Sequence, residues 1–224
     1  MILTDDDRKY LLNLVHEYID KNCIFRCNPN ERYSAYEDKG ILHKNKGLSY
    51  KFYLKNLMYD SKMLYCISAL FFDDIIKKIE NKEEYSSFQF VGMETSSIPL
   101  IIGLQQYAAR GKMSINGFTI RKQRSNNGIF NLIDGKIMNS PVIFVDDIID
   151  STLTIKKTLD ICVNELKLEP AKNMYSILKT NSTMEKIKYN EYVINANIPY
   201  CLNDFNYEYD PEKYWIPKDC EKGE

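Results

Sequence analysis

The chain has 224 residues, of which 44% are hydrophobic and 27% are charged. This length and composition suit a soluble globular protein that buries a substantial core in one domain with peripheral additions. The formal net charge of −1 gives no sign of a broad basic surface for nucleic acid. No apolar run approaches the ~20 residues of a membrane span, and the acidic N-terminus does not look like a signal peptide, so we expect a cytoplasmic protein.

Six cysteines are scattered along the chain. Only Cys23 and Cys27 are close together, and their C-x-x-x-C spacing has no second pair with which to form a zinc site. His16 and His43 are the only histidines in the sequence, so histidine-based metal chemistry is not expected. We therefore expect reduced core thiols and no metal bound directly by the protein.

The N-terminal part predicts a helix followed by a long polar connection. Thr4 and the three acids after it are typical of a capped helix N-terminus. Apolar residues at helical spacing continue from Leu11 to Ile19. The stretch 28–47 is polar and glycine-punctuated, which indicates a loop or hairpin.

A strand and a second helix are predicted next. Residues 49–54 alternate enough for a strand that ends in a turn near Asn56, and a helix is expected from Asp60 onward. We interpret the charged stretch 77–84 as a solvated surface exit from this helix.

The middle of the chain alternates between strand and helix patterns. This alternation favours an open α/β sheet in a single domain. From Thr180 onward the pattern weakens, and residues 200–215 are crowded with aromatic side chains. The strands are predicted at 88–91, 117–120, 142–145 and 173–178, and the helices at 98–109 and 155–166.

One stretch combines an apolar strand with two adjacent acids. Residues 142–145 suit a strand buried on both faces, as in a parallel sheet covered by helices. Asp146 and Asp147 then lie at its carboxyl end, where ligands bind in such sheets. The carboxylates could accept hydrogen bonds from the hydroxyls of a sugar.

Hydroxyl side chains follow these acids at the expected start of a helix. The hydroxyl and backbone N–H groups of Ser151, Thr152 and Thr154 would face outward there, where the helix dipole attracts anions. Acids beside a phosphate cradle suggest a phosphorylated sugar. The alternative is that Asp150 or Ser151 only caps the helix and that the acids belong to a solvated loop.

A basic loop follows the strand at 117–120. Arg121, Lys122 and Arg124 place three cations within four residues, ahead of Asn-Asn-Gly. The functional interpretation is a clamp on a polyanion. The alternative is the solvated tip of a hairpin.

The stretch from Val142 to Thr154 resembles the signature of the type I phosphoribosyltransferases, which bind 5-phosphoribosyl-1-pyrophosphate (PRPP). Its sequence Asp-Asp-Ile-Ile-Asp-Ser also resembles the ribose-5-phosphate loop of PRPP synthetases. Residues 92–99 resemble the pyrophosphate loop, and 118–128 with 133–135 resemble the start and the return of the mobile catalytic loop. Together with a base-site-like segment at 49–53, these pieces resemble an orotate-type phosphoribosyltransferase over 49–179.

The resemblance implies a parallel sheet flanked by helices, with a small hood near one end and an aromatic C-terminal extension. Within a single domain, residues 1–48 would form the N-terminal helix and hood region, 49–179 the core and 180–224 the extension. It also implies a homodimer, because orotate-type sites borrow the mobile loop from a neighbour. The aromatic extension would cap the base pocket or pack against another subunit.

The implied reaction transfers the 5-phosphoribosyl group of PRPP to a nucleobase-like acceptor and releases pyrophosphate, with Mg²⁺ bound mainly through PRPP. Asp146 and Asp147 would hold the ribose hydroxyls, and Arg121 and Lys122 would neutralise the pyrophosphate. The implied substrate-binding residues are Asp150, Ser151, Thr152, Leu153, Thr154, Glu94, Thr95, Ser96, Ser97, Arg124, Phe52, Tyr53 and Lys179.

Several residues depart from the family pattern. Thr152 and Leu153 stand where the phosphate loop usually has glycine or alanine, and Ser96 stands where the pyrophosphate loop has a lysine. Ser125 and Asn127 stand where orotate enzymes have a lysine and a histidine. Losing one such donor or cation typically costs ~3–4 kcal/mol of barrier lowering. The alternative function is therefore a catalytically degenerate protein that binds PRPP or a nucleotide as a sensor or complex subunit.

Overall fold

The computed structural model describes residues 2–26, 50–121, 132–149, 152–180, 184–208 and 216–217. The helices are α1 (Asp5–Tyr18), α3 (Lys55–Met58), α4 (Ser61–Glu80), α5 (Ser97–Arg110) and α6 (Thr152–Asp160). Short π-helical segments, Ile19–Cys23 and Ile161–Glu165, continue α1 and α6. The strands are β1 (Ile24–Arg26), β2 (Tyr50–Phe52), β3 (Gln89–Met93), β4 (Gly117–Ile120), β5 (Ile133–Gly135), β6 (Val142–Ile149), β7 (Asn173–Lys179), β8 (Lys186–Tyr189), β9 (Tyr192–Asn197), β10 (Tyr200–Cys201), β11 (Tyr207–Glu208) and β12 (Ile216–Pro217).

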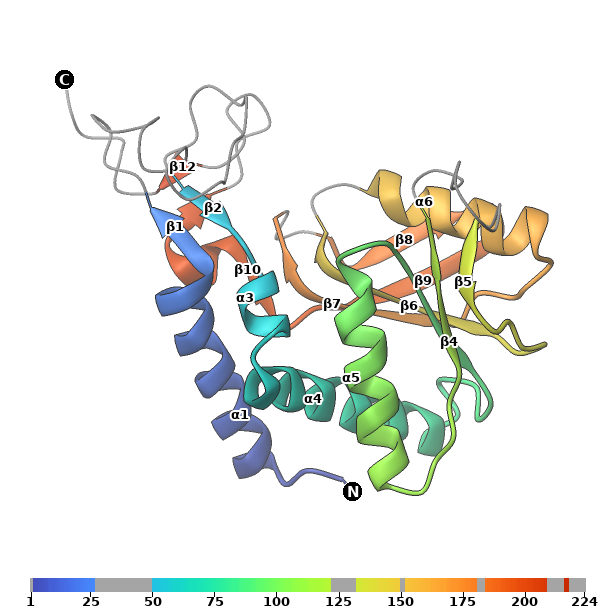
Figure 1. The fold of residues 1–224 in the computed structure, drawn as a ribbon, viewed down its shortest axis with the longest axis horizontal. Helices are drawn as coiled ribbons and strands as arrows, with labels where there is room; N and C mark the ends of the chain where they lie inside the picture. The colour runs from blue at the N-terminus through green and yellow to red at the C-terminus, as the bar shows by residue number, and fades with distance from the viewer. Residues whose placement is uncertain are drawn as a thin grey trace.

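An eight-stranded sheet forms the centre of the molecule (Figure 1). Its order is β5-β4-β3-β6-β7-β9-β8, and β10 pairs with the second half of β7. Strands β4, β3, β6, β7 and β9 run parallel, while β5 and β8 pair antiparallel at the two edges. The predicted parallel sheet flanked by helices is confirmed.

Helices cover both faces of this sheet because successive side chains of a strand point to opposite sides. Ile143 and Val145 of β6 join a buried cluster with residues of α1, α4 and α5. Val142 and Phe144 join a second cluster with residues of α6. In Figure 1, α5 and α6 accordingly lie on opposite sides of the sheet. The apolar run of β6 is thus explained by burial on both faces.

The connections out of β3 and β6 run in opposite directions. From β3 the chain passes through α5 to β4 on one side, and from β6 it passes through α6 to β7 on the other. In open α/β sheets, ligands bind beyond the carboxyl ends of the strands at such a switch point. The carboxyl ends of β3 and β6 are therefore the expected location of a ligand site.

Gly92 allows these two strands and α5 to approach closely. A Cβ atom at this position would lie 2.5 Å from the Val145 carbonyl oxygen and 2.3 Å from the Ser97 Cβ atom. Neither neighbour is the flexible end of a long side chain, so the backbone would have to shift. Gly92 thereby sets the distance between β6 and the loop that follows β3.

The N-terminal helix and the aromatic extension pack together at one end. The His16 ring stacks on Phe205 with 4.6 Å between centroids, and Phe52 packs edge-on against Phe205 and Tyr207 at 5.4 and 5.8 Å. The Tyr200 hydroxyl donates to the Leu12 carbonyl at 2.7 Å. The described part of the extension therefore packs against α1 and β2 of its own chain.

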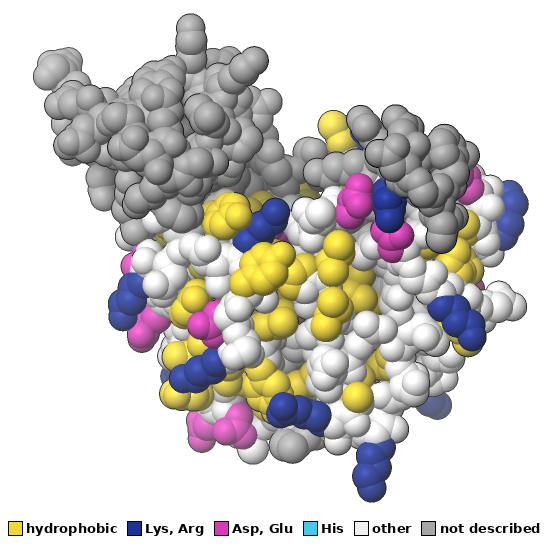
Figure 2. Space-filling view, viewed as in Figure 1, with side chains coloured by type: hydrophobic (Ala, Val, Ile, Leu, Met, Phe, Trp, Pro, Cys, Tyr) yellow, Lys and Arg dark blue, Asp and Glu magenta, His cyan; other side chains and the backbone are white. Residues whose placement is uncertain are grey.

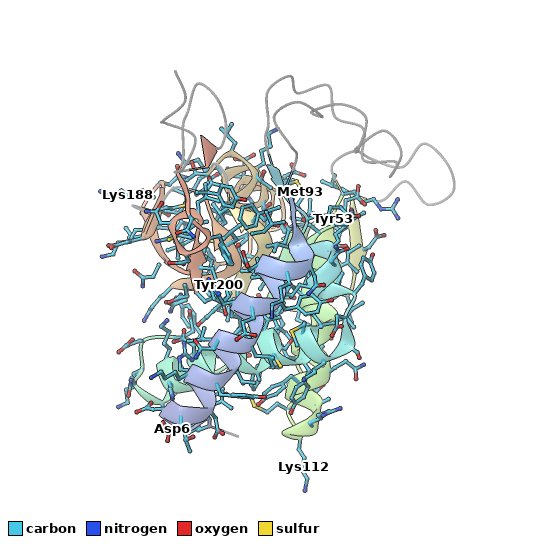
Figure 3. The ribbon with its side chains drawn as sticks, turned by 90° about the vertical axis from the view of Figure 1, so that its left-hand side faces the viewer. Asp6, Tyr53, Met93, Lys112, Lys188 and Tyr200 are labelled. Atoms are coloured by element: carbon cyan, nitrogen blue, oxygen red, sulfur yellow. The ribbon has the colours of Figure 1, made fainter. Side chains whose placement is uncertain are left out.

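Strands β1 and β2 with the aromatic extension, which we call the hood, lie toward the same end of the molecule as the switch point between β3 and β6. Figure 3 shows Tyr53, after β2, and Met93, at the end of β3, toward one end of the molecule. Asp6 and Lys112 lie toward the opposite end. The antiparallel pair β1–β2 thus lies toward the same end of the molecule as the loop that follows β3.

Several local expectations are confirmed. Thr4 caps α1 by accepting from the Asp7 N–H at 3.1 Å, and Asp60 caps α4 in the same way. Helix α5 ends before Gly111, and β4 has the predicted bounds. The turn expected near Asn56 is present, since the Asn56 N–H donates to the Tyr53 carbonyl at 3.2 Å, and it leads into the short helix α3.

The interpretation of residues 77–84 as a solvated exit is confirmed for residues 80–83, which are exposed, and is wrong for Glu84. Glu84 is only 6% exposed and accepts hydrogen bonds from the backbone and the side chain of Asn173, both at 3.0 Å. Lys77 and Lys78 form ion pairs with Asp73 and Asp74 one helical turn earlier. Lys78 and Glu84 therefore link α4 and the segment after it to the sheet, through Asn197 and Asn173.

Three strands of the sheet lie in the C-terminal region, where the sequence pattern weakens. The pair β8–β9 and strand β10 extend the sheet beyond β7. On the edge strand β8, Ile187 is buried while Lys186 and Lys188 are exposed. The alternation of apolar and polar residues in these short strands is present in the sequence, but the surrounding polar residues obscured it.

One face of the molecule carries uncovered apolar side chains. Figure 2 shows hydrophobic side chains gathered on the face that includes α4 and α5. Tyr59, Tyr65 and Ile102, which follow α3 or belong to α4 and α5, are 77%, 41% and 50% exposed.

Among the helices described, none has the length and apolar character needed to cross a bilayer. The homodimer implied by the resemblance stays a prediction.

Replacing Gly92 with alanine should destabilise the protein, because the added Cβ would meet Ser97 and the Val145 carbonyl oxygen. We expect the free energy of unfolding to fall by about 1–3 kcal/mol, as for other overpacked sites, in urea denaturation. Gly111→Ala is the matched control, since its Cβ would lie 3.3 Å from the Ala108 carbonyl oxygen, a much milder contact. Equal stability of wild type and Gly92→Ala would contradict the close approach.

Candidate functional site

Asp146 joins β6 to the loop that follows β3. Its side chain is only 9% exposed, and its Oδ1 atom accepts from the Ser96 hydroxyl at 3.2 Å and from the Asp147 backbone N–H at 2.9 Å. Asp147 is half-buried. The loop after β3 is therefore in direct contact with β6 through Ser96 and Asp146.

The acids lie within β6, although the sequence analysis placed them just after the strand. Asp146 pairs in register with Ser176 of β7, and β6 continues to Ile149 because the next residues pair with Leu178 and Lys179. A fixed strand backbone holds both carboxylates more rigidly than a loop would.

The environment of Asp146 favours its neutral form. Burial raises the pKa of this carboxyl well above its ordinary value, and the charge of Asp147 raises it further. The hydrogen bonds from Ser96 and from the Asp147 backbone act in the opposite direction but do not cancel the shift. The pair of acids therefore offers one buried carboxyl with a raised pKa and, beside it, one more accessible carboxyl group.

The loop after β3 is built into the start of α5. The buried Ser97 hydroxyl donates to the Met93 carbonyl at 2.7 Å, and the Glu94 N–H donates to Ile120 at 2.9 Å. Thr95 is exposed and Glu94 is half-buried. Ser97 therefore supports the loop, while Thr95 and the backbone around it face outward.

Helix α6 begins at Thr152, close after the acids. Leu153 is 66% exposed and Thr154 is also exposed, so neither side chain belongs to the core. The predicted sites at Asp150 and Ser151 lie outside the described residues. The first turn of α6 thus presents outward-facing side chains next to β6.

Arg121 is paired with an acid that the sequence analysis did not single out. Its Nε and Nη2 atoms donate to the two carboxylate oxygens of Asp134 at 2.7 and 2.9 Å. This contact lowers the pKa of the exposed Asp134 carboxyl. Lys122 and Arg124 lie outside the described residues. Arg121 follows β4 directly, and Asp134 lies in β5, which pairs antiparallel with β4. This strand pairing brings the two side chains together, and residue spacing alone did not predict it.

The remaining predicted residues lie at the same end of the molecule but in different surroundings. Lys179 ends β7, and its Nζ atom donates to the Met184 carbonyl at 3.1 Å. Phe52 is 4% exposed within the aromatic packing of the hood, whereas Tyr53 is half-buried. The structure therefore encloses Phe52 and leaves Tyr53 partly accessible.

Sequence comparison finds no match to this chain, either among protein-family models or among curated proteins. Comparison of structures does find matches. A phosphoribosyltransferase from Corynebacterium diphtheriae superposes with a TM-score of 0.61 at 11% identity, over 88% of this chain and 98% of that one. The chain has the type I phosphoribosyltransferase fold.

Orotate phosphoribosyltransferases are among the other structural matches. The Mycobacterium tuberculosis enzyme in complex with PRPP gives a TM-score of 0.52 at 15% identity, over 91% of this chain and 93% of that one. The Aeropyrum pernix enzyme gives 0.51 at 12% identity, over 85% and 96%. At these identities the likeness concerns the fold, so the phosphoribosyltransferase fold is confirmed and the activity is not.

The buried acid provides a test of the geometry at the switch point. Native Asp146 retains its proton to a higher pH than the unfolded chain does, so it lowers stability as pH rises from its ordinary pKa of 3.8 toward the raised native value. Asp146→Asn should therefore be more stable than wild type at pH 7, and the difference should shrink as pH falls toward 4. Urea unfolding across this pH range measures it, with the exposed Asp6→Asn as control. A less stable Asp146→Asn protein at pH 7 would contradict the burial.

Proposed function

We propose that the chain is a phosphoribosyltransferase that transfers the 5-phosphoribosyl group of PRPP to a nitrogen of a nucleobase-like acceptor. In this reaction the bond from C1 of the ribose to pyrophosphate breaks, a C1–N bond forms, and the acceptor nitrogen loses a proton. The contact between Ser96 and Asp146 is the observation that supports this most strongly. It joins the pyrophosphate-like loop to the PRPP-like stretch at the switch point of the sheet.

The acids and the first turn of α6 would divide the recognition of PRPP between them. Asp147, as the more accessible carboxylate, would accept from a ribose hydroxyl, and protonated Asp146 could donate to or accept from its neighbour. The N-terminal turn of α6, with Thr152 and Thr154, would hold the 5-phosphate together with Ser151. These roles support binding, and the chemistry then depends mainly on positioning the reactants and stabilising the departing charge.

The residues present fit a Mg²⁺ ion that is held largely by its substrate. No group of three or more potential ligands among His, Cys, Asp and Glu gathers anywhere in the described part of the chain. Two adjacent acids with one accessible carboxylate suit an ion that keeps several waters and takes its other oxygens from PRPP. When bound, the ion would neutralise part of the pyrophosphate charge, and Asp147 would hold it directly or through water.

The main alternative is a protein that binds PRPP or a nucleotide without turnover. Two observations favour it. Ser96 supplies a hydroxyl where the family has a lysine, and that hydroxyl is engaged with Asp146. Arg121, a proposed pyrophosphate partner, is engaged with Asp134. A slow or absent reaction would follow if these cations and donors cannot reach the departing group.

PRPP with Mg²⁺ should raise the thermal midpoint by on the order of 5–10 °C when PRPP is present at about one hundred times its dissociation constant. Asp147→Asn should largely abolish this shift, because the amide removes the negative charge and replaces one acceptor oxygen with a donor. Glu80→Gln, at an exposed position at the end of α4, is the control and should retain it. Absence of a shift with PRPP, ribose 5-phosphate and nucleoside monophosphates would count against both functions.

Pyrophosphate release separates the enzyme from the sensor. Wild-type protein is incubated with PRPP, Mg²⁺ and a panel of bases that includes orotate, and the released pyrophosphate is measured. We expect release above the hydrolysis background with at least one base, and its loss in Asp147→Asn. Binding of PRPP without release for any base would favour the sensor.

Asp134→Asn should increase the affinity for PRPP several-fold, because Arg121 would no longer have to leave an anionic partner to reach pyrophosphate. Asp134→Glu is the matched control, since it keeps the charge and should bind PRPP as wild type does. Titration calorimetry at fixed Mg²⁺ measures the effect, which should diminish at high salt because both groups are exposed. Weaker binding by Asp134→Asn would show that the ion pair supports the site instead of competing with it.

A further inference from the structure

A separate pocket lies between α1, α4 and the sheet. Its volume is about 200 Å³, and its lining comes from α1, α4, β7, β9 and the two residues that follow β9. Tyr175 forms part of its wall and belongs to the face of the sheet covered by α1 and α4. The acids proposed to bind PRPP do not line it.

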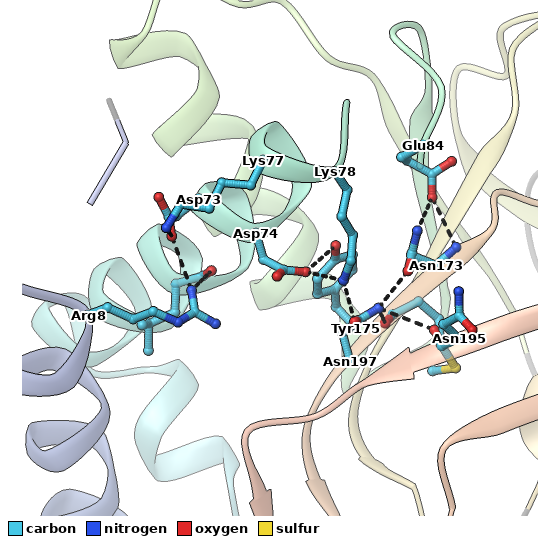
Figure 4. A network of polar contacts seen from close by, with 12 residues as sticks. Arg8, Asp73, Asp74, Lys77, Lys78, Glu84, Asn173, Tyr175, Asn195 and Asn197 are labelled. Carbon is cyan, nitrogen blue, oxygen red and sulfur yellow. Dashed lines mark hydrogen bonds and ion pairs between the residues drawn. The ribbon is translucent and has the colours of Figure 1, made fainter. Parts of the chain in front are cut away.

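Two opposite charges line this pocket with unused hydrogen-bonding capacity. The Nη1 atom of Arg8 donates to Asp73 at 3.1 Å and to the Leu70 carbonyl at 3.5 Å, while its Nε and Nη2 atoms have no partner in the described ranges. The Oδ2 atom of Asp74 accepts from Tyr175 at 2.8 Å and from Lys78 at 2.6 Å. Its Oδ1 atom has no hydrogen-bond partner among the same residues. Figure 4 shows Asp74 between Arg8 and Tyr175.

The polar contacts hold these two charges in place. Asp73 is fully buried and is paired with Lys77 at 3.0 Å as well as with Arg8. Lys78 also contacts the Asn197 side chain, which donates to Asn173 and to the Met174 carbonyl, both at 3.1 Å. This network, drawn in Figure 4, connects α1 and α4 with β7 and β9. Arg8 and Asp74 are therefore positioned before any ligand arrives.

The rest of the lining is mainly apolar. Leu12, Phe71 and Pro199 contribute to it, and none of them offers a polar side-chain atom. A cavity of about 150 Å³ can hold benzene, so the volume here suits a branched aliphatic or aromatic side chain with a small polar head. The ligand should therefore combine an apolar body with groups that satisfy both charges.

We propose that this pocket binds a small zwitterion with an apolar side chain, the class to which leucine and phenylalanine belong. Its carboxylate would accept charge-assisted hydrogen bonds from the Nε and Nη2 atoms of Arg8. Its ammonium would donate to the Oδ1 atom of Asp74, and its side chain would lie against Leu12 and Phe71. A simple anion would leave the Oδ1 atom of Asp74 without a donor, and a simple cation would leave the Nε and Nη2 atoms of Arg8 without an acceptor. The proposal does not depend on PRPP binding.

The ligand class is tested by nuclear magnetic resonance titration of the full chain with L-leucine and L-phenylalanine. We expect saturable shifts of backbone signals in α1, α4 and β9, with a dissociation constant on the order of 1 mM or tighter. 4-Methylpentanoate and 3-methylbutylamine, which each lack one charge of leucine, should bind at least about tenfold more weakly. Equal binding of either analogue, or no shifts with either amino acid at about 10 mM, would overturn the proposal.

The position of the site is tested with a matched pair of variants on α1. Leu12→Phe should fill the pocket and weaken leucine binding at least about tenfold. Leu11→Phe changes a neighbouring half-buried residue outside the lining and should bind leucine as wild type does. Unchanged binding in a folded Leu12→Phe protein would overturn the assignment to this pocket.

A selectivity measurement avoids dependence on folding yield. In Asp74→Asn the preference for leucine over 4-methylpentanoate should disappear, because the ammonium loses its anionic partner. This ratio does not change with the fraction of protein that is folded. A preference equal to that of wild type would overturn the role of Asp74.

Discussion

The close approach of β3 to β6 is the constraint on which the arrangement of this protein depends. Gly92 has no Cβ, and this lets the Val145 carbonyl and the start of α5 come within a distance that no side chain would permit. The loop after β3 is thereby held against the acids of β6, close enough for Ser96 to bond to Asp146. A wider separation would leave two unconnected loops at the end of the sheet.

The same close packing makes the ionised form of Asp146 unfavourable for the stability of the native state. A carboxyl that is largely removed from water beside a second carboxyl destabilises the native state once it ionises. Such perturbed groups gather at functional sites more often than elsewhere, although structural networks perturb pKa values too. The buried Asp73 belongs to such a structural network, because two cations, Arg8 and Lys77, compensate its charge. Within the described ranges Asp146 has only hydrogen-bond donors for compensation, which is why the proposed function is built around it.

Much of the fold follows from local sequence features, and much of the site does not. Caps such as Thr4 and the doubly buried run of β6 depend on neighbouring residues, so pattern alone predicts them. The partner of Arg121 depends on how β4 pairs with β5, and the burial of Glu84 depends on a contact with Asn173, far away in the chain. The acids were predicted at the right end of the sheet, but the extent of β6 was missed because pairing with β7 outweighs the low strand propensity of aspartate.

The charged residues of the two edge strands bear on how the protein behaves at high concentration. Open sheet edges present unpaired backbone groups that can recruit a strand from another molecule. Here β8 displays Lys186 and Lys188 outward, and β5 is short and carries the exposed, charged Asp134. Pairing β8 with the β8 strand of a second copy would bring these lysines close to one another, whereas Asp134 is already paired with Arg121. The β8 border of the sheet thus repels a copy of itself, and the β5 border offers little length for pairing.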